Sequence, residues 1–470
     1  MSELLPLCDR TVSSLNEGLP AAEDSRHMKR SDFIKTTAAA FAAPTILRSS
    51  ARAQEGKEDK PAPSERITLG LIGCGGQGTG DMRGIMNSPD IQVLAVCDPD
   101  KNQAAQAKGH VEKHYSEGST GGTYKGCDVY GDFRELCARQ DIDAIIVGTP
   151  DHWHALCTLE ALRNGKDVYC EKPITHLFAE GQAVYKEAAK RKAIFQVGSQ
   201  QRSDVYFRIA AEAVMNGLIG KITNVKVGLP TGRGTDELGR IGQPIPENLD
   251  YDMWCGPSRY LPFHPKRLHW DWRWCLDYGG GQLMDWIGHH NDIAHWGLGM
   301  DKSGPIKVEA KNFRFPEKGM YDQAIDYEVV SEYEGGYTIT LSNQHKMGKD
   351  GRNMGTMWEG TDGWIYVDRG RLEASNKDWI RESTDRGPIK AYVSRSHHKN
   401  FIEGVKTRTE CICPAETGHR SATPGHLGYA SLALGRPIKW DPIKEEAVDD
   451  PKADKLIKTV QYRGDWKLEA

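Results

Sequence analysis

Residues 66–78 read RITLGLIGCGGQG, a β-branched and apolar run that leads directly into a glycine-rich turn. Residues 66–72 have the composition of a strand buried on both faces of a parallel sheet. In a dinucleotide-binding turn of this spacing, Gly73 permits the tight turn, Gly75 lets the backbone approach a pyrophosphate, and Gly78 lets the next helix pack on the strand. The N-terminus of that helix offers free N–H groups to phosphates. The residues expected to contact a dinucleotide are Gly73, Gly75, Gly76, Gln77 and Gly78.

A second buried strand, Ile91 to Cys97, ends at the acidic residue Asp98. A carboxylate about 20 residues beyond such a turn is placed to bind the hydroxyls of the adenosine ribose. Because it would repel a 2′-phosphate, NAD is favoured over NADP, although the nearby Lys101 keeps NADP possible. The alternative interpretation of Asp98 is a plain turn residue in the sequence Asp-Pro-Asp.

Strands and helices continue to alternate as far as residue 197. Strands are predicted at Ile142–Val147, Lys166–Cys170 and Ala193–Val197, and helices at Trp153–Asn164 and Phe178–Arg191. This alternation is typical of a doubly wound parallel sheet, a Rossmann domain, which we assign to residues 66–200. Ligands of such sheets bind at the carboxyl ends of the strands.

The remaining residues, 201–470, have a different pattern. Alternating apolar and polar residues at Lys221–Gly228, Ala324–Tyr333 and Tyr337–Ser342 predict an antiparallel sheet. The chain becomes helical again from His397 to Leu434, with a break near Cys413 and Pro414, and we expect part of this region to pack back onto the first domain. The fold class is therefore α/β followed by α+β.

The composition excludes several classes of protein. The 470 residues carry a net charge of −4, so the chain lacks the basic character of a nucleic-acid-binding protein. No apolar run reaches the roughly 20 residues of a membrane-spanning helix. Eleven cysteines are too few for a disulfide scaffold. A globular multidomain protein remains, most often an enzyme.

Residues 1–53 are predicted to be an N-terminal extension with a signal-like segment. From Met28 onward, a basic opening precedes a mildly apolar stretch and then Ala51-Arg52-Ala53, a small-x-small cleavage pattern. Residues 30–35 resemble a twin-arginine export signal, with Ser31 in place of the second arginine. The pattern predicts export to the periplasm, and the alternative is a disordered basic tail. Residues 54–65 are charged and contain prolines, so they are interpreted as a linker.

Three further motifs resemble a known family. Glu171-Lys172-Pro173 follows a predicted strand, residues 149–154 read TPDHWH, and Gly279-Gly280-Gly281 leads to residues 285–289, DWIGH. With the glycine turn, they resemble the glucose–fructose oxidoreductase, inositol dehydrogenase and rhizopine-catabolism (Gfo/Idh/MocA) family of NAD(P)-dependent oxidoreductases. The likeness extends from about Arg66 to the C-terminus, and the Trp-rich insert and C-terminal region look like the secreted bacterial branch.

The resemblance implies a large open antiparallel sheet in the second domain, whose exposed faces often pair in homo-oligomers. It also implies a catalytic group made of Lys172, Asp285 and His289. The family often has glycine two residues after the aspartate, where this chain has Ile287, so the adjacent His290 is a competing candidate near the substrate. The resemblance places four more residues beside the cofactor: Thr149, Pro150, His154 and Glu171.

These residue types suit hydride transfer. Removal of hydride from an alcohol carbon requires a base for the hydroxyl proton, and a partly desolvated Lys172 beside a cationic nicotinamide gives up its proton readily. If the residues after the glycine run are helical, Asp285 and His289 project from one face, where the carboxylate could orient the imidazole or fix the substrate hydroxyl. The alternatives are a structural pair and a zinc site. No third ligand occurs at diagnostic spacing, so no metal is expected.

Six of the 12 tryptophans fall in residues 254–296. Indole faces can bind the apolar faces of sugar rings, which makes Trp272 and the adjacent Arg273 candidate substrate residues; the alternative is that the tryptophans pack an irregular insert. Gln201, which follows the last predicted strand of the first domain, is a candidate to border the same cleft.

We therefore predict an NAD-dependent oxidoreductase that acts on a secondary alcohol of a sugar, polyol or glycoside. One alternative is a glycosidase or lyase that uses NAD for transient ring oxidation and elimination. Another is a non-enzymatic NAD-linked binding protein.

Overall fold

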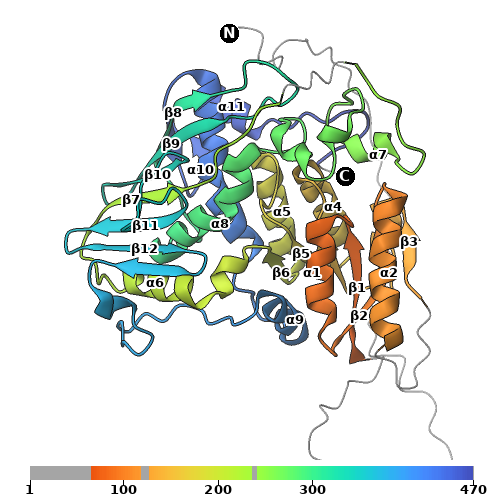
Figure 1. The fold of residues 1–470 in the computed structure, drawn as a ribbon, viewed down its shortest axis with the longest axis horizontal. Helices are drawn as coiled ribbons and strands as arrows, with labels where there is room; N and C mark the ends of the chain where they lie inside the picture. Colours follow the sequence, from red (N-terminus) through yellow and green to blue (C-terminus); the bar gives the residue numbers. More distant parts are fainter. Residues whose placement is uncertain (1–64, 118–125, 236–240, 469–470) are drawn as a thin grey trace, which may run out of the picture. The chain divides into compact units, whose positions relative to one another are not determined.

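The computed structural model describes residues 65–117, 126–235 and 241–468 (Figure 1). The signal-like segment and almost all of the predicted linker lie outside these described residues. The described chain forms two sheets, and helices α5, α8 and α10 lie between them (Figure 1).

The first sheet has six parallel strands in the order β3-β2-β1-β4-β5-β6. The central strand β4 shows why it forms: all of its residues are buried, Ile146 in one hydrophobic cluster and Ile145 and Val147 in another, on the opposite face. The predicted Rossmann sheet is therefore confirmed. Its elements are β1 (Ile67–Ile72), α1 (Gly76–Met86), β2 (Ile91–Cys97), α2 (Lys101–Glu117), β3 (Asp128–Tyr130), α3 (Phe133–Cys137), β4 (Ala144–Val147), α4 (Asp151–Arg163), β5 (Asp167–Cys170), α5 (Phe178–Arg191) and β6 (Phe195–Val197).

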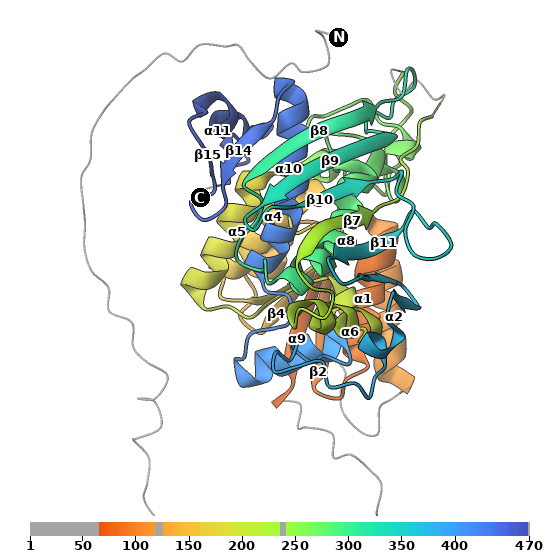
Figure 2. The same ribbon diagram turned by 90° about the vertical axis from the view of Figure 1, so that its left-hand side faces the viewer.

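The second sheet has nine strands in the order β13-β12-β11-β7-β10-β9-β8-β14-β15 (Figure 2). Burial alternates along β9, so one face packs against helices and the other is half-exposed. The predicted antiparallel sheet is confirmed with one difference, since β7 pairs with β10 in parallel. A long connection that includes α8 separates the two strands in sequence, and it gives the chain room to return in the same direction.

The elements of this second region are α6 (Val205–Met215), β7 (Ile222–Gly228), α7 (Tyr251–Cys255), α8 (Gly281–Leu298), β8 (Lys307–Arg314), β9 (Asp326–Tyr333), β10 (Tyr337–Ser342), β11 (Gly355–Gly360), β12 (Trp364–Asp368), β13 (Arg371–Ala374), α9 (His397–Thr407), α10 (Ala415–Leu434), β14 (Ile438–Asp441), β15 (Glu446–Ala447) and α11 (Pro451–Lys458). Short 3-10 turns occur at Gln200–Ser203, Pro265–Arg267, Asp271–Trp274 and Lys377–Ile380.

Helix α10 connects the two sheets. It packs against helix α5 of the first domain, against α8, and against strands β8 and β9 of the second sheet. Small residues permit this close packing: a Cβ added at Gly418 would lie 2.7 Å from Val197 of β6, and one at Gly428 would lie 2.7 Å from Val329 of β9. Helix α9 packs against α1. The C-terminal helices therefore lie against the first domain and help to hold α8 beside it.

Candidate active site

The glycine turn between β1 and α1 leaves backbone groups open to a ligand. Gly73 has φ +88°, and a Cβ at Gly78 would lie 2.1 Å from the carbonyl oxygen of Gly73. Both positions therefore require glycine. Gly75 is the N-cap of α1 without a side-chain cap, and a Cβ at Gly75 or Gly76 would meet nothing within 4 Å. The start of α1 therefore has no side-chain cap and leaves room for a ligand beside Gly75 and Gly76.

Asp98 lies at the carboxyl end of β2 and is tied to this turn. Its Oδ2 accepts a hydrogen bond from the Cys74 N–H at 2.7 Å, and its Oδ1 accepts one from the Asp100 N–H at 2.8 Å. Burial raises the pKa of Asp98 to about 6, although both N–H groups act in the opposite direction. The carboxylate therefore has the geometry of a turn residue and also faces the pocket described next.

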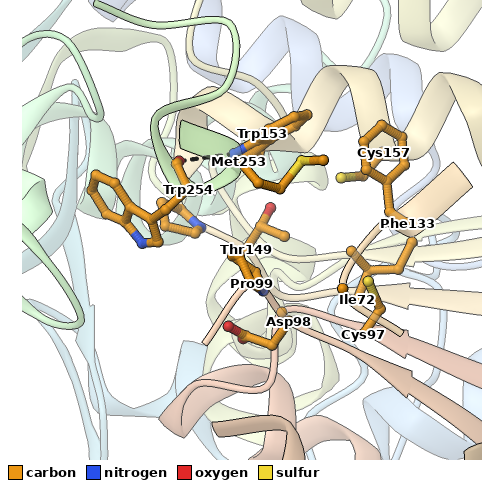
Figure 3. Close-up of a pocket in the computed structure, with 13 residues that line it drawn as sticks. Ile72, Cys97, Asp98, Pro99, Phe133, Thr149, Trp153, Cys157, Met253 and Trp254 are labelled. Atoms are coloured by element: carbon orange, nitrogen blue, oxygen red, sulfur yellow. Dashed lines mark hydrogen bonds between the residues drawn. The ribbon is translucent and has the colours of Figure 1, made fainter. Parts of the chain in front are cut away.

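An open pocket lies beside Asp98, at the carboxyl ends of β1, β2 and β4 (Figure 3), and its empty space of about 440 Å³ includes solvent at its mouth. Its lining is mostly apolar, and the buried Oγ1 of Thr149 has no hydrogen-bond partner among the described residues. The second domain contributes Met253 and Trp254 to its wall. The lining residues are Ile72, Gly73, Cys97, Asp98, Pro99, Gly131, Phe133, Thr149, Pro150, Trp153, Cys157, Met253 and Trp254.

Lys172 and Asp285 form a buried ion pair at the carboxyl end of β5. The Nζ of Lys172 lies 2.8 Å from Asp285 Oδ1 and also donates to the Asp285 carbonyl oxygen at 3.0 Å. The two side chains are only 11% and 8% exposed. Arg273 adds a second cation, with its Nε 3.2 Å from the same Oδ1. Burial opposes ionisation of Asp285, but Lys172 and Arg273 outweigh it and hold the carboxyl pKa below its usual value.

His289 lies one turn beyond Asp285 on α8, as the helical spacing predicts, but the two side chains are not paired. Asp285 binds Lys172 and Arg273 instead. Burial, followed by the charge of Lys172, holds the pKa of His289 well below its usual value, so its imidazole is neutral near pH 7. Its Nδ1 is buried without a hydrogen-bond partner among the described residues. Of the two roles expected for Asp285, orientation of His289 is therefore not observed, because Lys172 and Arg273 occupy the carboxylate.

Gly288 allows α8 to approach Lys172. A Cβ at this position would lie 3.0 Å from the Cβ of Lys172. The adjacent His290 points elsewhere: its Nδ1 lies 3.3 Å from Nε2 of Gln201, and its ring stacks on Trp286. Gln201 is buried, and its Oε1 has no hydrogen-bond partner among the described residues. Of the two neighbouring histidines, only His289 lies one helical turn after Asp285, the residue that binds Lys172.

His154 and Glu171 support the backbone around the site. The His154 ring bridges two motifs, with Nδ1 2.7 Å from the Pro173 carbonyl oxygen and Nε2 2.9 Å from that of Thr149. Burial lowers the pKa of His154 to about 4. Glu171 is buried and accepts a hydrogen bond from Gln200 at 2.8 Å, and burial raises its pKa. Both side chains are thus engaged with protein groups.

The tryptophan run divides into packing and exposed members. Trp272 is buried in a hydrophobic cluster, as is Trp274, which favours the packing interpretation for these two. Trp270 is 61% exposed. The guanidinium of Arg273 lies 4.1 Å from the centre of the Trp270 ring and 4.5 Å from that of Trp272. The two indoles therefore hold Arg273 in place against Asp285.

Sequence reasoning missed three residues. Asp151, the first residue of α4, is fully buried near Asp285, and burial together with the Asp285 charge raises its pKa to about 8. Its position in the motif that follows β4 could have identified it. Met253 and Trp254 line the pocket from the second domain, and no sequence signal connects them to the glycine turn.

Two further properties concern the described residues only. Within 65–117, 126–235 and 241–468, no three His, Cys, Asp or Glu side chains lie together in an arrangement that could hold a metal ion. None of the helices in these ranges combines the length and apolar character needed to cross a membrane.

Comparison with known proteins identifies both halves of the chain. Residues 67–199 match the model of an oxidoreductase family's NAD-binding Rossmann fold, named Gfo/Idh/MocA. Residues 208–468 match the C-terminal alpha/beta domain of the same oxidoreductase family.

Some of the individual relatives are distant but match over nearly their whole length. An uncharacterized oxidoreductase, YrbE, of Bacillus subtilis is 25% identical over 80% of this chain and 97% of its own length. A myo-inositol 2-dehydrogenase of Thermotoga maritima is 24% identical over 79% of this chain and 95% of its own length. Among solved structures, the WlbA dehydrogenase of Bordetella pertussis, in complex with NADH and UDP-GlcNAcA, has a TM-score of 0.58 at 16% identity and covers 80% of this chain and 99% of its own. This last likeness supports the fold.

Proposed function

The chain belongs to the Gfo/Idh/MocA family of oxidoreductases with an NAD-binding Rossmann domain, and from this premise we propose that it transfers hydride between NAD and a secondary alcohol of a sugar, polyol or glycoside. The observation that carries the proposal is the buried contact of 2.8 Å between Lys172 and Asp285. The neutral His289 lies one helical turn beyond Asp285 on α8. This group lies at the carboxyl end of β5, where ligands of parallel sheets bind.

The turn and the pocket fit a dinucleotide. The open space beside Gly75 and Gly76 at the start of α1 suits a pyrophosphate. The Thr149 hydroxyl, which has no partner among the described residues, borders the apolar pocket that an adenine ring would enter. The ionised carboxylate of Asp98 would accept hydrogen bonds from ribose hydroxyls and repel a 2′-phosphate, which favours NAD over NADP. Bound NAD supplies the hydride acceptor or donor.

Each member of the buried group has a distinct task in this proposal. His289 accepts the hydroxyl proton of the alcohol, because its imidazole is neutral. The ammonium group of Lys172 donates a hydrogen bond to the same oxygen and stabilises the negative charge that develops there. Asp285 fixes Lys172 through two contacts, and Arg273 keeps Asp285 ionised.

Two observations support a sugar or polyol as the substrate. Curated relatives include inositol 2-dehydrogenases, whose substrate is a cyclic polyol by name. The exposed indole of Trp270, with Arg273 stacked on it, offers a flat apolar surface next to a hydrogen-bond donor. We propose that Gln201, whose Oε1 lacks a partner among the described residues, borders the substrate from the other side, and that the fully buried His290 supports Gln201.

The test is a panel of sugars, polyols and glycosides incubated with NAD, with absorbance followed at 340 nm. We expect NADH to accumulate with at least one member, and Lys172→Met to lower kcat by about 10²- to 10⁴-fold, the usual contribution of acid–base and electrostatic groups. Lys399→Met, on the exposed side of α9, is the control and should behave as the wild type.

Other outcomes of this panel identify the competing functions. Product formation without any change at 340 nm would favour a glycosidase or lyase that oxidises the ring transiently. NAD binding without turnover of any substrate would favour a binding protein. Turnover that survives Lys172→Met would overturn the proposed catalytic group.

We also propose that the protein is exported, on the strength of the signal-like residues 1–53 alone. All ten cysteines among the described residues are free and buried, so a chain folded before export would carry its thiols shielded from oxidants. Fractionation of the host cells, with residues 28–53 deleted as the control, tests the location. A homo-oligomer formed through the half-exposed face of the second sheet is a further expectation, which light scattering would check.

A further inference from the structure

A tight turn of the second sheet carries an arginine beside α8. Strands β12 and β13 are joined by a loop of two residues, Arg369 and Gly370, between the paired residues Asp368 and Arg371. Gly370 has φ +70°, a left-handed conformation that glycine adopts without strain. Because a loop this short has little freedom to move, the two strands fix where the backbone of Arg369 lies.

The Arg369 side chain is linked to the candidate active site through one indole ring. Its guanidinium lies 4.8 Å from the centre of the Trp286 ring. The same ring forms a T-shaped contact with His289, with the ring centres 5.2 Å apart, and it stacks on His290 at 5.6 Å. The charge of Arg369 also acts on His289, because it lowers the pKa of this histidine after burial and Lys172 do so. The guanidinium therefore lies near the proposed base.

Within the described part of the chain, the guanidinium of Arg369 has neither an ion pair nor a hydrogen bond. The adjacent Asp368 uses its Oδ1 to accept the backbone N–H of Arg369 at 2.7 Å, and the same oxygen lies 3.7 Å from His290 Nε2. Arg371, on the other side of the turn, is engaged, since its Nε pairs with Glu373 at 2.6 Å. The exposed Arg369 is thus left to bind an anion from solvent.

The charged side chains around this region carry more positive than negative charge. They are the cations Lys172, Arg273 and Arg369 and the carboxylates Asp285 and Asp368. Two further carboxyl groups do not offset the excess, because burial raises the pKa of Asp151 to about 8 and also raises that of Glu171. The oxidised nicotinamide ring of NAD would add another positive charge. An anionic substrate therefore matches the site better than a neutral one.

The chemistry of arginine indicates which anions fit. Its planar fork of N–H donors matches two oxygens of a carboxylate or a phosphate. The cation–π contact with Trp286 holds the fork in place and leaves its outer edge for a ligand. A sugar ring and an indole are of similar size. A sugar whose reacting hydroxyl contacts Lys172 and His289 would therefore place an acidic group on the far side of its ring near Arg369.

We propose that Arg369 binds the acidic group of an anionic sugar, either a sugar acid or a sugar phosphate, and that the protein prefers such substrates to their neutral counterparts. The inference rests on the proposed function, because it takes Lys172 and His289 as the place of hydride transfer. It deepens that function by naming the charge of the substrate and the residue that selects it. Carboxylate and phosphate share the chemistry that an arginine recognises, and the experiment separates them.

The first test compares matched sugars on the wild-type protein with NAD. The sets are glucose, glucuronate and glucose 6-phosphate, and galactose, galacturonate and galactose 6-phosphate. We expect kcat/KM to be at least about tenfold higher for an acidic member than for its neutral counterpart, and the better acidic member identifies the group as carboxylate or phosphate. Neutral sugars that react as well as the acidic ones would overturn the inference and leave the oxidoreductase intact. No turnover of any sugar would instead overturn the proposed function.

The second test removes the charge. Arg369→Met should lower kcat/KM for the acidic sugar by about 10- to 150-fold, mostly through KM, and change that for the neutral sugar less than about twofold. Arg369→Lys, which keeps the charge without the fork, should give an intermediate value. Arg381→Met is the matched control, because this exposed arginine of the same domain pairs with Asp378 at 2.8 Å. Equal losses on acidic and neutral sugars, or an acidic preference that survives Arg369→Met, would overturn the inference.

Discussion

The burial of Asp98 sets how the cofactor site responds to pH. Its carboxylate accepts two backbone N–H bonds, yet burial dominates and raises its pKa to about 6. The folded-state pKa lies above the unfolded value of 3.8, so the ionised form costs stability above pH 6, and that cost disappears as the pH falls toward 4. Function and stability therefore respond to this group in opposite directions.

We predict that NAD affinity falls as the pH is lowered through about 6, because protonated Asp98 is a poorer acceptor for ribose hydroxyls. The dissociation constant should rise by up to about tenfold per pH unit below the pKa. Titration calorimetry between pH 5 and 7.5 measures it. Asp98→Asn should bind NAD more weakly at pH 7.5 and lose this pH dependence; a variant that keeps the same slope would show that another group is responsible.

The candidate residues could be named from the sequence, but their pairing could not. Lys172, Asp285 and His289 were identifiable from motifs after a strand and along a helix. Side-chain packing around α8 decides these pairings. It places Asp285 on Lys172 and Arg273, and it leaves His289 neutral and not paired with Asp285. Asp151 was missed because its importance arises from burial beside another carboxylate, which no spacing within one segment reveals.

At the scale of helices and strands, α10 positions α8, which carries the candidate catalytic residues. Its Gly425 faces α8, where an added Cβ would lie 2.4 Å from Met284 Sδ and 2.9 Å from Ile287 Cδ1. Met284 immediately precedes Asp285 on α8. A change in the packing of these two helices is thus transmitted directly to the candidate active site.

We predict that Gly425→Ala destabilises the protein by about 1–3 kcal/mol, the usual cost of overpacking, and lowers kcat as α8 shifts. Thermal unfolding and steady-state kinetics measure the two effects. Gly109→Ala in α2 is the matched control, because its Cβ would meet nothing within 4 Å. It should stabilise the protein by about 0.5–1 kcal/mol through helix propensity alone. Equal effects of the two substitutions would contradict the packing argument.

The sequence predicts most of these elements because their apolar periods are strong. The strands β2 and β10 and the helix α5 have the predicted bounds. In contrast, β3 is a three-residue edge strand whose residues are mostly exposed, so it has no apolar run to detect. The parallel pairing of β7 with β10 was also not predicted, since pairing between distant segments depends on tertiary packing rather than on local pattern.

At the scale of the whole described chain, a buried ion pair joins α8 to the turn that follows the Rossmann domain. Arg202 lies in the turn that follows the last Rossmann strand, and its Nε is 2.7 Å from Asp292 Oδ2 on α8. Both side chains are 1% exposed. A second carboxylate, that of Asp301 just beyond the end of α8, lies 2.7 Å from Arg202 Nη2. The guanidinium also lies 5.3 Å from the centre of the Trp296 ring. This guanidinium therefore adds to the contacts of α10 and Lys172 that position α8.

We predict that Asp292→Asn destabilises the protein by roughly 3–5 kcal/mol, because it leaves most of the charge of Arg202 buried without its main partner. The double variant Arg202→Met/Asp292→Leu should recover most of that loss, since an apolar side chain can pack on Trp296 in place of the guanidinium and Asp301 is 37% exposed to solvent. Denaturant unfolding of the NAD-saturated protein measures both variants. The single variant should also weaken the coupling between the domains, so that two unfolding transitions separate in calorimetry where the wild type gives one. An Asp292→Asn protein as stable as the wild type, or a double variant less stable than the single one, would mean that the contacts of α10 alone hold α8 in place.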